Sequence, residues 1–471
     1  MEDITFMPAT DLIAKVRSKE LSPVEVTHHF LGRIEALNPH LNAFLTVCGD
    51  EALAAAKEAE ASILRGDATG ALHGLPIAIK DLNLTKGIRT TRGSTIYRDS
   101  IPDHDDILVE RVKAAGAVIV GKTNTPEFGH RGTTENRLGE PCRNPWDTTR
   151  TTGGSSGGAG GALAAGMVPI AQGSDGGGSI RIPSSLCGVY GIKPTQGRVP
   201  RLYEGFGGLG PLGQNGPMAL TVRDAVLLFG VLSGHDGRDP TSVEEPLPDF
   251  TDALRGDVRG LRIAWSPDFG YAAVEPEVAA AALEAVRVLE KLGANVEEAT
   301  PPIDGETVFD TFRHVFFADY VANWGPLVPE HGDEMTPFLR EELEWMQAEG
   351  VAAYTNALRE MERHRYRMRR FYDDYDLLVS PATATTAFPI EQFPETINGR
   401  AVEKMWGFTP FTYPINMSGQ TAASVPIGFS SAGLPIGLQI AGPKFAEANV
   451  VCASAALEAA MPWRDRHPAV G

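Results

Sequence analysis

Two glycine-rich turns, separated by a run of small residues, constrain this chain of 471 residues more than any other feature. The first turn covers residues 153–158 and the second covers residues 176–179, and both contain serine. Glycine has no Cβ, so a ligand or a neighbouring segment can approach such a turn closely. Consecutive glycine N–H groups can also form a concave site for an anion. Serines in turns of this kind predict acyl transfer, with the attacking oxygen and the oxyanion donors in one segment.

A flexible linker and a phosphate-binding loop are the simplest alternatives for this segment. A linker would not continue directly into Ile-Arg-Ile-Pro at residues 180–183. A phosphate-binding loop needs lysine followed by Ser or Thr after its second glycine, whereas Gly158 is followed by Ala159 and Gly160. The linker is therefore disfavoured and the phosphate-binding loop is rejected.

The first turn also fits the G-x-S-x-G nucleophile elbow of α/β-hydrolases, at residues 153–157. That motif needs an acidic residue and then a histidine further along the chain. The late histidines are sparse and none lies in a recognisable motif: His314, His331, His364 and His467. The elbow therefore remains a weaker hypothesis for the same catalytic segment.

The segment as a whole resembles the amidase signature family. That family is marked by GGSSGG, then by a serine within D-x-G-G-S-I-R-x-P, then by G-x-K-P-T, and all three stand between residues 151 and 195. Ser179 follows Ser155 by 24 positions, which is the family's own spacing. Two departures flank the motif, where Thr152 replaces a frequent proline and Ser174 replaces a frequent threonine.

Other segments extend the resemblance over nearly the full chain, and it is weakest from about residue 234 to residue 375. The matching segments are residues 74–81, 121–128 and 433–440. The resemblance implies a layered α/β/α fold, in which helices cover a large, mixed, mostly parallel central sheet.

The resemblance also implies roles for individual residues. In the family a lysine acts through a serine held by a cis peptide bond, and a second serine is the nucleophile. Carried over, Lys80 is the base, Ser155 the bridge and Ser179 the nucleophile that forms the acyl-enzyme. The further implied residues are Gly176, Gly177 and Gly178 in the oxyanion hole, Ser156, Asp175 and Arg181 orienting the turns, and Gly129 and His130 lining the substrate pocket. No metal and no organic cofactor is implied.

A lysine can serve as this base only when its amine is neutral. At the ordinary pKa of about 10.4, roughly 0.04 % of lysine side chains are neutral at pH 7. Burial beside Ile77 and Ile79 could bring the pKa of Lys80 towards 7–8, a destabilisation of the charged form by about 4 kcal/mol. The pattern at residues 75–79, a short apolar strand, permits that burial.

Composition restricts the partners and the compartment. The formal net charge is −18, from 60 acidic and 42 basic residues, which disfavours nucleic acid and anionic membranes as partners. The four cysteines are scattered without metal-ligand spacing. There is no signal-peptide pattern and no apolar run of about 18 residues. We therefore expect a cytoplasmic protein, as a monomer or a homodimer. The resemblance implies that its substrate is a small-molecule amide.

The order of elements predicts one layered domain over residues 1–471. A helical segment, residues 1–70, comes first, and helices then alternate with short apolar strands, as at residues 106–120 and 277–296. Residues 307–375 form an aromatic-rich helical excursion, expected near the substrate entrance. The basic run at its end, residues 359–370, is interleaved with glutamates, so we interpret it as a solvated helix side.

These observations predict a hydrolase that cleaves the C–N bond of a small, apolar or aryl carboxylic amide; carbamates and esters are within reach of the same chemistry. The alternative is the glutaminase (A) subunit of a tRNA-dependent amidotransferase. That subunit needs a carboxylate for the glutamine amine in a segment resembling D-x-x-T-x-P-x-N, where this chain has Thr409. A binding protein on an inactive amidase scaffold is disfavoured, because all three catalytic positions are filled.

Overall fold

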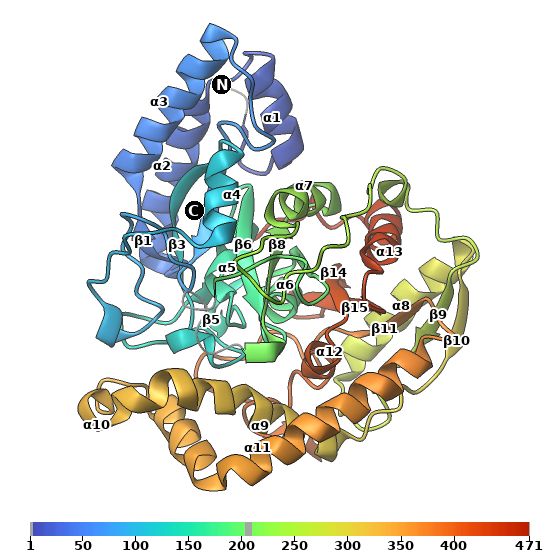
Figure 1. Cartoon of the computed structure of the whole chain (residues 1–471). Helices are drawn as coiled ribbons and strands as arrows, with labels where there is room; N and C mark the ends of the chain where they lie inside the picture. The colour runs from blue at the N-terminus through green and yellow to red at the C-terminus, as the bar shows by residue number, and fades with distance from the viewer. Residues whose placement is uncertain (1–2, 203–209, 471) are drawn as a thin grey trace.

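The structure, a computed structural model, describes residues 3–202 and 210–470 (Figure 1). A sheet of eleven strands crosses this part of the chain. In spatial order the strands are β1 (Phe44–Val47), β3 (Val118–Thr123), β2 (Pro76–Lys80), β6 (Ile170–Asp175), β8 (Gln214–Ala219), β7 (Tyr190–Lys193), β14 (Thr421–Phe429), β15 (Pro435–Gly442), β11 (Leu377–Pro381), β9 (Arg262–Trp265) and β10 (Asn295–Glu298). Short strand pairs lie outside this sheet: β4 (Arg143–Asn144) with β5 (Asp147–Thr151), and β12 (Thr396–Ile397) with β13 (Arg400–Ala401). The large central sheet expected from the sequence is present.

The sheet is mixed, and its ends differ from its middle. Strands β3, β2 and β6 are parallel at one end, and β11, β9 and β10 are parallel at the other. From β6 through β8, β7, β14 and β15 to β11, the described neighbours are antiparallel, as are β1 and β3. The expectation of a mostly parallel order therefore holds for the two ends and not for the middle. There β14 and β15 are joined by a tight hairpin at Gly433, which makes them antiparallel, whereas pairs such as β7 with β14 join strands from distant parts of the chain.

The helices begin and end close to the predicted positions. Ser22 forms a capping box with Glu25 at the start of α2, and Gly116 follows the helix that precedes β3. The α-helices of the described residues are α1 (Ala9–Arg17), α2 (Pro23–Leu41), α3 (Gly49–Arg65), α4 (Ile107–Ala114), α5 (Gly157–Ala164), α6 (Arg181–Cys187), α7 (Val222–Leu232), α8 (Pro276–Lys291), α9 (Gly305–Trp324), α10 (Val328–His331), α11 (Pro337–Phe371), α12 (Tyr413–Ser418) and α13 (Glu447–Ala460).

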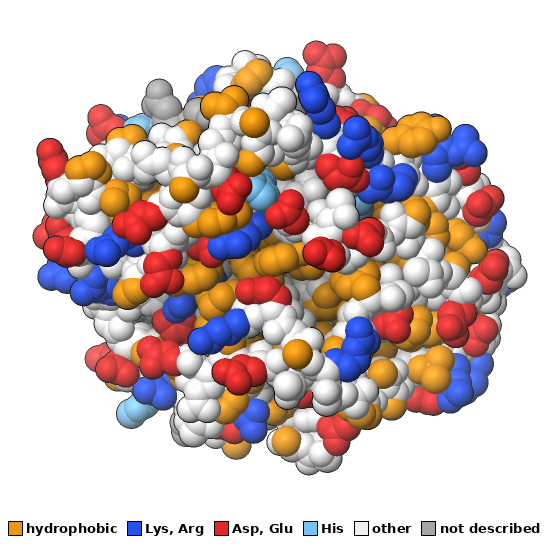
Figure 2. Space-filling model, turned by 90° about the horizontal axis from the view of Figure 1, so that it is seen from below, with side chains coloured by type: hydrophobic (Ala, Val, Ile, Leu, Met, Phe, Trp, Pro, Cys, Tyr) orange, Lys and Arg blue, Asp and Glu red, His pale blue; other side chains and the backbone are white. Residues whose placement is uncertain are grey.

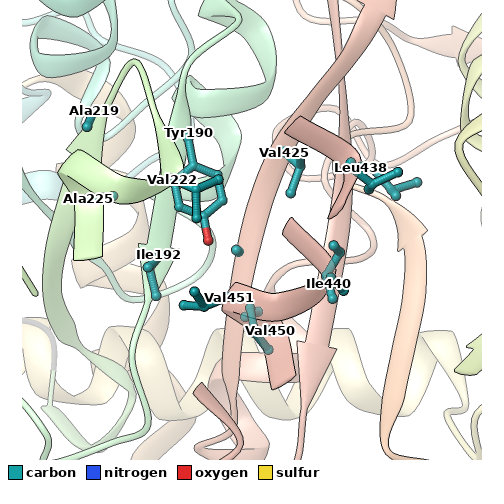
Figure 3. Close-up of a cluster of buried hydrophobic side chains, with 14 of the residues drawn as sticks. Tyr190, Ile192, Ala219, Val222, Ala225, Val425, Leu438, Ile440, Val450 and Val451 are labelled. Carbon is teal, nitrogen blue, oxygen red and sulfur yellow. The ribbon is translucent and has the colours of Figure 1, made fainter. Parts of the chain in front are cut away.

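A hydrophobic cluster joins the middle of the sheet to α7 and α13. Figure 3 shows Tyr190 and Ile192 of β7 meeting Val222 of α7 and Val450 and Val451 of α13. All five side chains are buried. Because successive strand residues point to opposite faces, the residues between these apolar positions face the other side of the sheet.

Helix α6 lies very close to that other face. A Cβ on Gly191 of β7 would lie 2.3 Å from Ser184 Oγ, and a Cβ on Gly437 of β15 would lie 2.6 Å from Ser185 Oγ. Any side chain at these two glycines would push α6 away from the sheet. Because α6 directly follows the second glycine-rich turn, this packing positions Ser179.

The aromatic excursion is helical, as predicted, and consists of α9, α10 and α11. Its aromatic residues Phe312, Phe316 and Tyr320 are buried in a cluster of their own. α11 changes direction at Gly350, whose φ of 78° is not helical. The basic run forms ion pairs along the helix, such as Arg363 with Glu360, which agrees with a solvated side. The view from below in Figure 2 shows hydrophobic side chains towards the middle of that face, with acidic and basic side chains interspersed.

Residues 3–202 and 210–470 contain no group of histidine, cysteine and acidic side chains arranged to hold a metal ion. None of the helices in these ranges is long and apolar enough to cross a membrane. The four cysteines are free.

Candidate active site

The side chain of Lys80 ends among three serine hydroxyls. Lys80 is the last residue of β2, which lies between β3 and β6 in a parallel end of the sheet. The residue is fully buried, and its Nζ donates to Ser155 Oγ at 2.7 Å and to Ser156 Oγ and Ser174 Oγ at 2.9 Å each. The structure therefore brings together three predicted site residues. Ser174, noted in the sequence only as a departure from a frequent threonine, is a fourth.

The charged form of Lys80 has little to stabilise it. Within the described ranges no carboxylate lies at ion-pair distance from Nζ, and its hydrogen-bond partners are neutral hydroxyls. Burial lowers the pKa of Lys80 well below its usual 10.5, and the charge of Asp175 opposes this shift only in part. The site therefore favours the neutral amine, which has a lone pair that can accept a proton.

The hydroxyl groups around Lys80 differ in whether their proton is already donated in a hydrogen bond to another group. Ser156 Oγ donates to the Ser174 carbonyl oxygen and accepts from the Ser174 N–H, both at 3.1 Å. The Ser156 hydroxyl proton is therefore engaged in a hydrogen bond to the backbone. Ser155 Oγ is bonded to Lys80 Nζ alone among the described residues. The Gly154–Ser155 peptide bond is cis, as the resemblance implied. Ser155 is thus the hydroxyl nearest to Nζ, and its proton is free to move.

Ser179 ends the second glycine-rich turn, directly after β6. Its exposed fraction is 8 %, against 1 % for Ser155, so Ser179 is the more accessible of the two serines. The two turns are adjacent, since the Ser156 N–H donates to the Ser179 carbonyl oxygen at 3.1 Å. No hydrogen bond directly joins the hydroxyls of Ser155 and Ser179 in the part of the chain that the structure describes.

The carboxylate of Asp175 forms a hydrogen bond with the backbone of the second turn. Its Oδ1 accepts the Gly178 N–H at 2.8 Å. That amide is therefore already used within the turn, which removes Gly178 from the predicted oxyanion donors. The N–H groups of Gly176, Gly177 and Ser179 have no hydrogen-bond partner among the described residues, and they remain available to a ligand.

Asp175 and Arg181 form a fully buried ion pair. Arg181 Nε and Nη2 donate to the two oxygens of Asp175 at 2.9 Å each, and Arg181 also donates to Asn416 Oδ1 and Gln439 Oε1 at 2.6 Å. Burial alone would raise the pKa of Asp175, but the charge and hydrogen bonds of Arg181 outweigh it and lower the pKa to about 2. The pair therefore stays charged. The resemblance implied that Asp175 and Arg181 orient the turns, but Asn416 and Gln439 were not predicted, although both lie in segments that resemble the family.

Phe312 of the helical excursion and residues of the segment 406–413 contact the second turn. Thr412 Oγ1 donates to the Gly177 carbonyl oxygen at 2.7 Å. A Cβ on Gly177 would lie 2.7 Å from the ring of Phe312 in α9 and 3.3 Å from the ring of Trp406. Tyr413 in turn stacks on Phe312, with 5.0 Å between the ring centroids. Thr412 stands at the threonine of the D-x-x-T-x-P-x-N segment, and the contact with the second turn shows what its hydroxyl does in the fold.

The two predicted pocket residues lie beside the first turn. A Cβ on Gly129 would lie 3.3 Å from Ser155 Oγ, so Gly129 borders the predicted bridging serine. His130 is fully buried, its Nδ1 contacts the Glu127 carbonyl oxygen at 2.6 Å, and its ring stacks on Phe338. Burial lowers the pKa of His130 to about 3, which keeps the ring neutral. Its Nε2 is buried without a partner among the described residues.

Comparisons with known proteins agree with this geometry. A sequence model of the Amidase family matches residues 25–451. The chain is 38 % identical to an acylamidase of Rhodococcus erythropolis over 472 residues, covering 99 % of this chain and 98 % of that protein. It is also 38 % identical to the A chain of the glutamyl-tRNA(Gln) amidotransferase of Chloroflexus aggregans, covering 99 % of each protein.

A solved structure extends these similarities to the fold. A bacterial aryl acylamidase of the amidase signature family superimposes with a TM-score of 0.92 at 33 % identity, covering 98 % of this chain and 97 % of that one. The fold and the site together define a hydrolase of amide bonds. The chain belongs to the amidase signature family.

Proposed function

We propose that this enzyme hydrolyses a small, apolar or aryl carboxylic amide through an acyl-enzyme on Ser179. In this proposal Lys80 is the general base and Ser155 carries protons between Lys80 and Ser179. The observation that carries the proposal is the fully buried amine of Lys80, which contacts hydroxyls and, within the part of the chain that the structure describes, no carboxylate.

Acylation would proceed as a coupled proton transfer. Neutral Lys80 takes the hydroxyl proton of Ser155, Ser155 takes that of Ser179, and Ser179 Oγ attacks the carbonyl carbon of the amide. When the tetrahedral intermediate collapses, the C–N bond breaks and the amine leaves with the proton that Lys80 returns through Ser155. Water then attacks the ester by the same route, which releases the carboxylate and restores the free serine.

The amides of Gly176, Gly177 and Ser179 would bind the oxyanion. They need no reorganisation at the moment of reaction if the turn is rigid, and preorganised donors of this kind are worth about 3–4 kcal/mol each. Two contacts support that rigidity: the bond from Thr412 to the Gly177 carbonyl oxygen and the bond from Gly178 to Asp175. Ser156 would act indirectly by orienting Lys80, and Arg181 would act indirectly by orienting Asp175.

The choice of an apolar or aryl amide rests on what borders the second turn. Phe312 and Trp406 contact Gly177, and flat aromatic side chains favour an apolar acyl or amine group. Similarity to an acylamidase and an aryl acylamidase supports the same choice. Carbamates and esters carry the same carbonyl carbon, so they belong to the substrates to be tested.

The alternative function is that of the glutaminase component of a tRNA-dependent amidotransferase. The similarity of this chain to such proteins supports that alternative. Thr409, which stands where that function needs a carboxylate, is fully buried, and its hydroxyl donates to the Trp406 carbonyl oxygen at 3.1 Å. A neutral, already bonded hydroxyl is a poor partner for an ammonium group. We therefore place this function second.

A labelling experiment combined with a substrate panel tests both functions. A serine-directed phosphonate should give an adduct that peptide mapping places on Ser179, and Ser179→Ala should abolish both the adduct and hydrolysis. An anilide, an alkyl amide, an aryl carbamate and glutamine should then be compared by kcat/KM. An adduct on Ser155 with an active Ser179→Ala variant would support the nucleophile elbow instead, and glutamine as the best substrate would support the glutaminase.

A further inference from the structure

The guanidinium of Arg92 has no direct charged partner among the described residues. The side chain is partly buried, and its guanidinium carbon lies over the rings of Tyr97 and Trp324, at 4.9 Å and 5.4 Å from their centroids. Within residues 3–202 and 210–470 the guanidinium makes neither a hydrogen bond nor an ion pair. By contrast Arg89, three residues earlier, donates to the carbonyl oxygens of Leu45 and Arg98.

The buried carboxylates whose charges reach Arg92 make hydrogen bonds to other groups through Oδ2, while Asp81 Oδ1 and Asp106 Oδ1 have no hydrogen-bond partner among the described residues. Asp81 accepts from the hydroxyl and the N–H of Thr91, and Asp106 accepts from a side-chain amide and a backbone N–H. Glu127, in the adjoining loop, accepts from two hydroxyls and a backbone N–H. Burial lowers the pKa of Arg92, and the negative charges around it reverse this only in part. A partly desolvated guanidinium with five donors and no acceptor is costly unless a ligand supplies one.

The backbone of Arg92 is held in an uncommon conformation. Its φ is 55°, in the left-handed region that residues other than glycine rarely adopt. The N–H donates to the Asp81 carbonyl oxygen at 3.1 Å, and the carbonyl oxygen accepts the Phe128 N–H at 2.8 Å. Strained residues of this kind cluster at binding and catalytic sites, because the surrounding structure must maintain them.

Both backbone partners of Arg92 adjoin the proposed catalytic residues. Asp81 follows Lys80 in the chain, and Phe128 precedes Gly129, which borders Ser155. The Phe128 ring also stacks on Trp324 at 3.9 Å between centroids, so the guanidinium rests on the same aromatic cluster. The backbone of Arg92 is therefore tied by hydrogen bonds to residues that adjoin Lys80 and Gly129 in the chain.

We propose that Arg92 binds a carboxylate carried by the amide substrate, at the end remote from the bond that is cleaved. The inference rests on the proposed function and narrows it to acidic amides, either acylated aminobenzoates or monoamides of dicarboxylic acids. Tyr97 and Trp324 hold the guanidinium against their rings, and the planar fork of arginine matches a carboxylate.

Matched substrate pairs test this inference. The first pair is 4-acetamidobenzoate and 4′-methylacetanilide, with the charge on the amine side. The second pair is succinanilic acid and butyranilide, with the charge on the acyl side. In at least one pair the wild type should show a kcat/KM about tenfold or more in favour of the acid, mainly through KM, and Arg92→Met should lose that preference. Arg92→Lys keeps the charge without the fork and should retain an intermediate preference.

Arg89→Met is the control, because it removes a neighbouring arginine that is already bonded to the protein, and it should leave the preference unchanged. If Arg92→Met does not fold, the acid of the preferred pair should still raise the Tm of a Ser179→Ala enzyme more than its neutral counterpart does.

Equal kcat/KM within both wild-type pairs would overturn the role of Arg92 while leaving amide hydrolysis intact. If added benzoate instead increased the rate of hydrolysis of the neutral amides, Arg92 would bind an effector and not a carboxylate of the substrate, which would overturn the proposal. Failure to cleave any of the four amides would count against the proposed function itself.

Discussion

Two lysines on neighbouring strands, Lys80 and Lys122, are both fully buried and yet have opposite surroundings. Their strands β2 and β3 are parallel, and Lys122 is paired with Ile79, so the two side chains point to opposite faces of the sheet. Lys122 Nζ donates to the Asn83 carbonyl oxygen and to Thr90 Oγ1 at 2.7 Å each, and lies 3.6 Å from Asp81 Oδ1. Lys80 has hydroxyl partners and no such carboxylate among the described residues.

The difference shows what makes a buried lysine suitable as a base. Burial lowers the pKa of both amines, but Asp81 and Asp106 oppose the shift at Lys122, whereas Asp175 alone opposes it at Lys80. A lysine beside a carboxylate remains an ion pair and holds the structure together. A lysine among hydroxyls can lose its proton and accept another.

The largest effect should come from replacing Lys80. Lys80→Met keeps the volume and removes the base, so kcat/KM should fall by about 10³-fold or more, while the unfolding transition changes little. Lys80→Arg should be equally inactive, because guanidinium stays charged at any workable pH. Steady-state kinetics and urea unfolding measure the two quantities, and an active arginine variant would show that Lys80 acts only as a cation.

Replacing Lys122 should instead affect stability. Lys122→Met leaves Asp81 buried without its counter-ion, which should reduce the free energy of unfolding by about 3–5 kcal/mol. The folded fraction should keep a kcat close to that of the wild type. Urea unfolding with active-site titration checks this, and Lys122→Met with Asp81→Asn should recover part of the loss. A stable Lys122→Met enzyme with no activity would remove the contrast between the two lysines.

The pH dependence of the wild type should report Lys80. Only the neutral amine accepts a proton, so kcat/KM should rise about tenfold per pH unit below the pKa of Lys80 and level off above it. That pKa is lowered from 10.5, so the plateau should begin well below pH 10. The same shift means that the contribution of Lys80 to stability falls as the pH falls from 10.5 to its folded pKa, since the unfolded chain binds the extra proton in that range. A rate that still rises steeply at pH 10 would contradict the lowered pKa.

The smallest effect should come from the hydroxyl that does not pass a proton. Ser156→Ala removes one hydrogen bond to Lys80 and the bonds to the Ser174 backbone. We expect a loss of about tenfold in kcat, equivalent to about 1.4 kcal/mol. Ser155→Ala should lose far more, because it interrupts the proposed relay. Equal losses for both variants, measured under the same conditions, would show that Ser155 has no special role.

Much of this site could be predicted because its motifs are local. Turns that contain Ser155 and Ser179 need glycine for close approach, and a strand that ends in Lys80 is visible as a short apolar run. The parallel ends of the sheet were predicted for the same reason, since alternating helices and strands mark them in the sequence. The antiparallel middle was not, because pairs such as β7 with β14 and β11 with β15 join strands that are far apart in the sequence, so no local pattern states their relative direction.

By itself, the sequence determined the residue types that carry the chemistry, their spacing and the resemblance to a family, because these depend on short segments of chain. The tertiary structure alone decided which groups are charged and which have hydrogen-bond or ion-pair partners. Arg181 meets Asn416 across 235 positions of sequence, the Gly178 amide is taken by Asp175, and Arg92 is left without an acceptor among the described residues. Burial and hydrogen bonding depend on all neighbours in space, so no local pattern can state whether Lys80 is isolated from carboxylates. That isolation arises only when β2, β6 and the two serine turns pack together and exclude water.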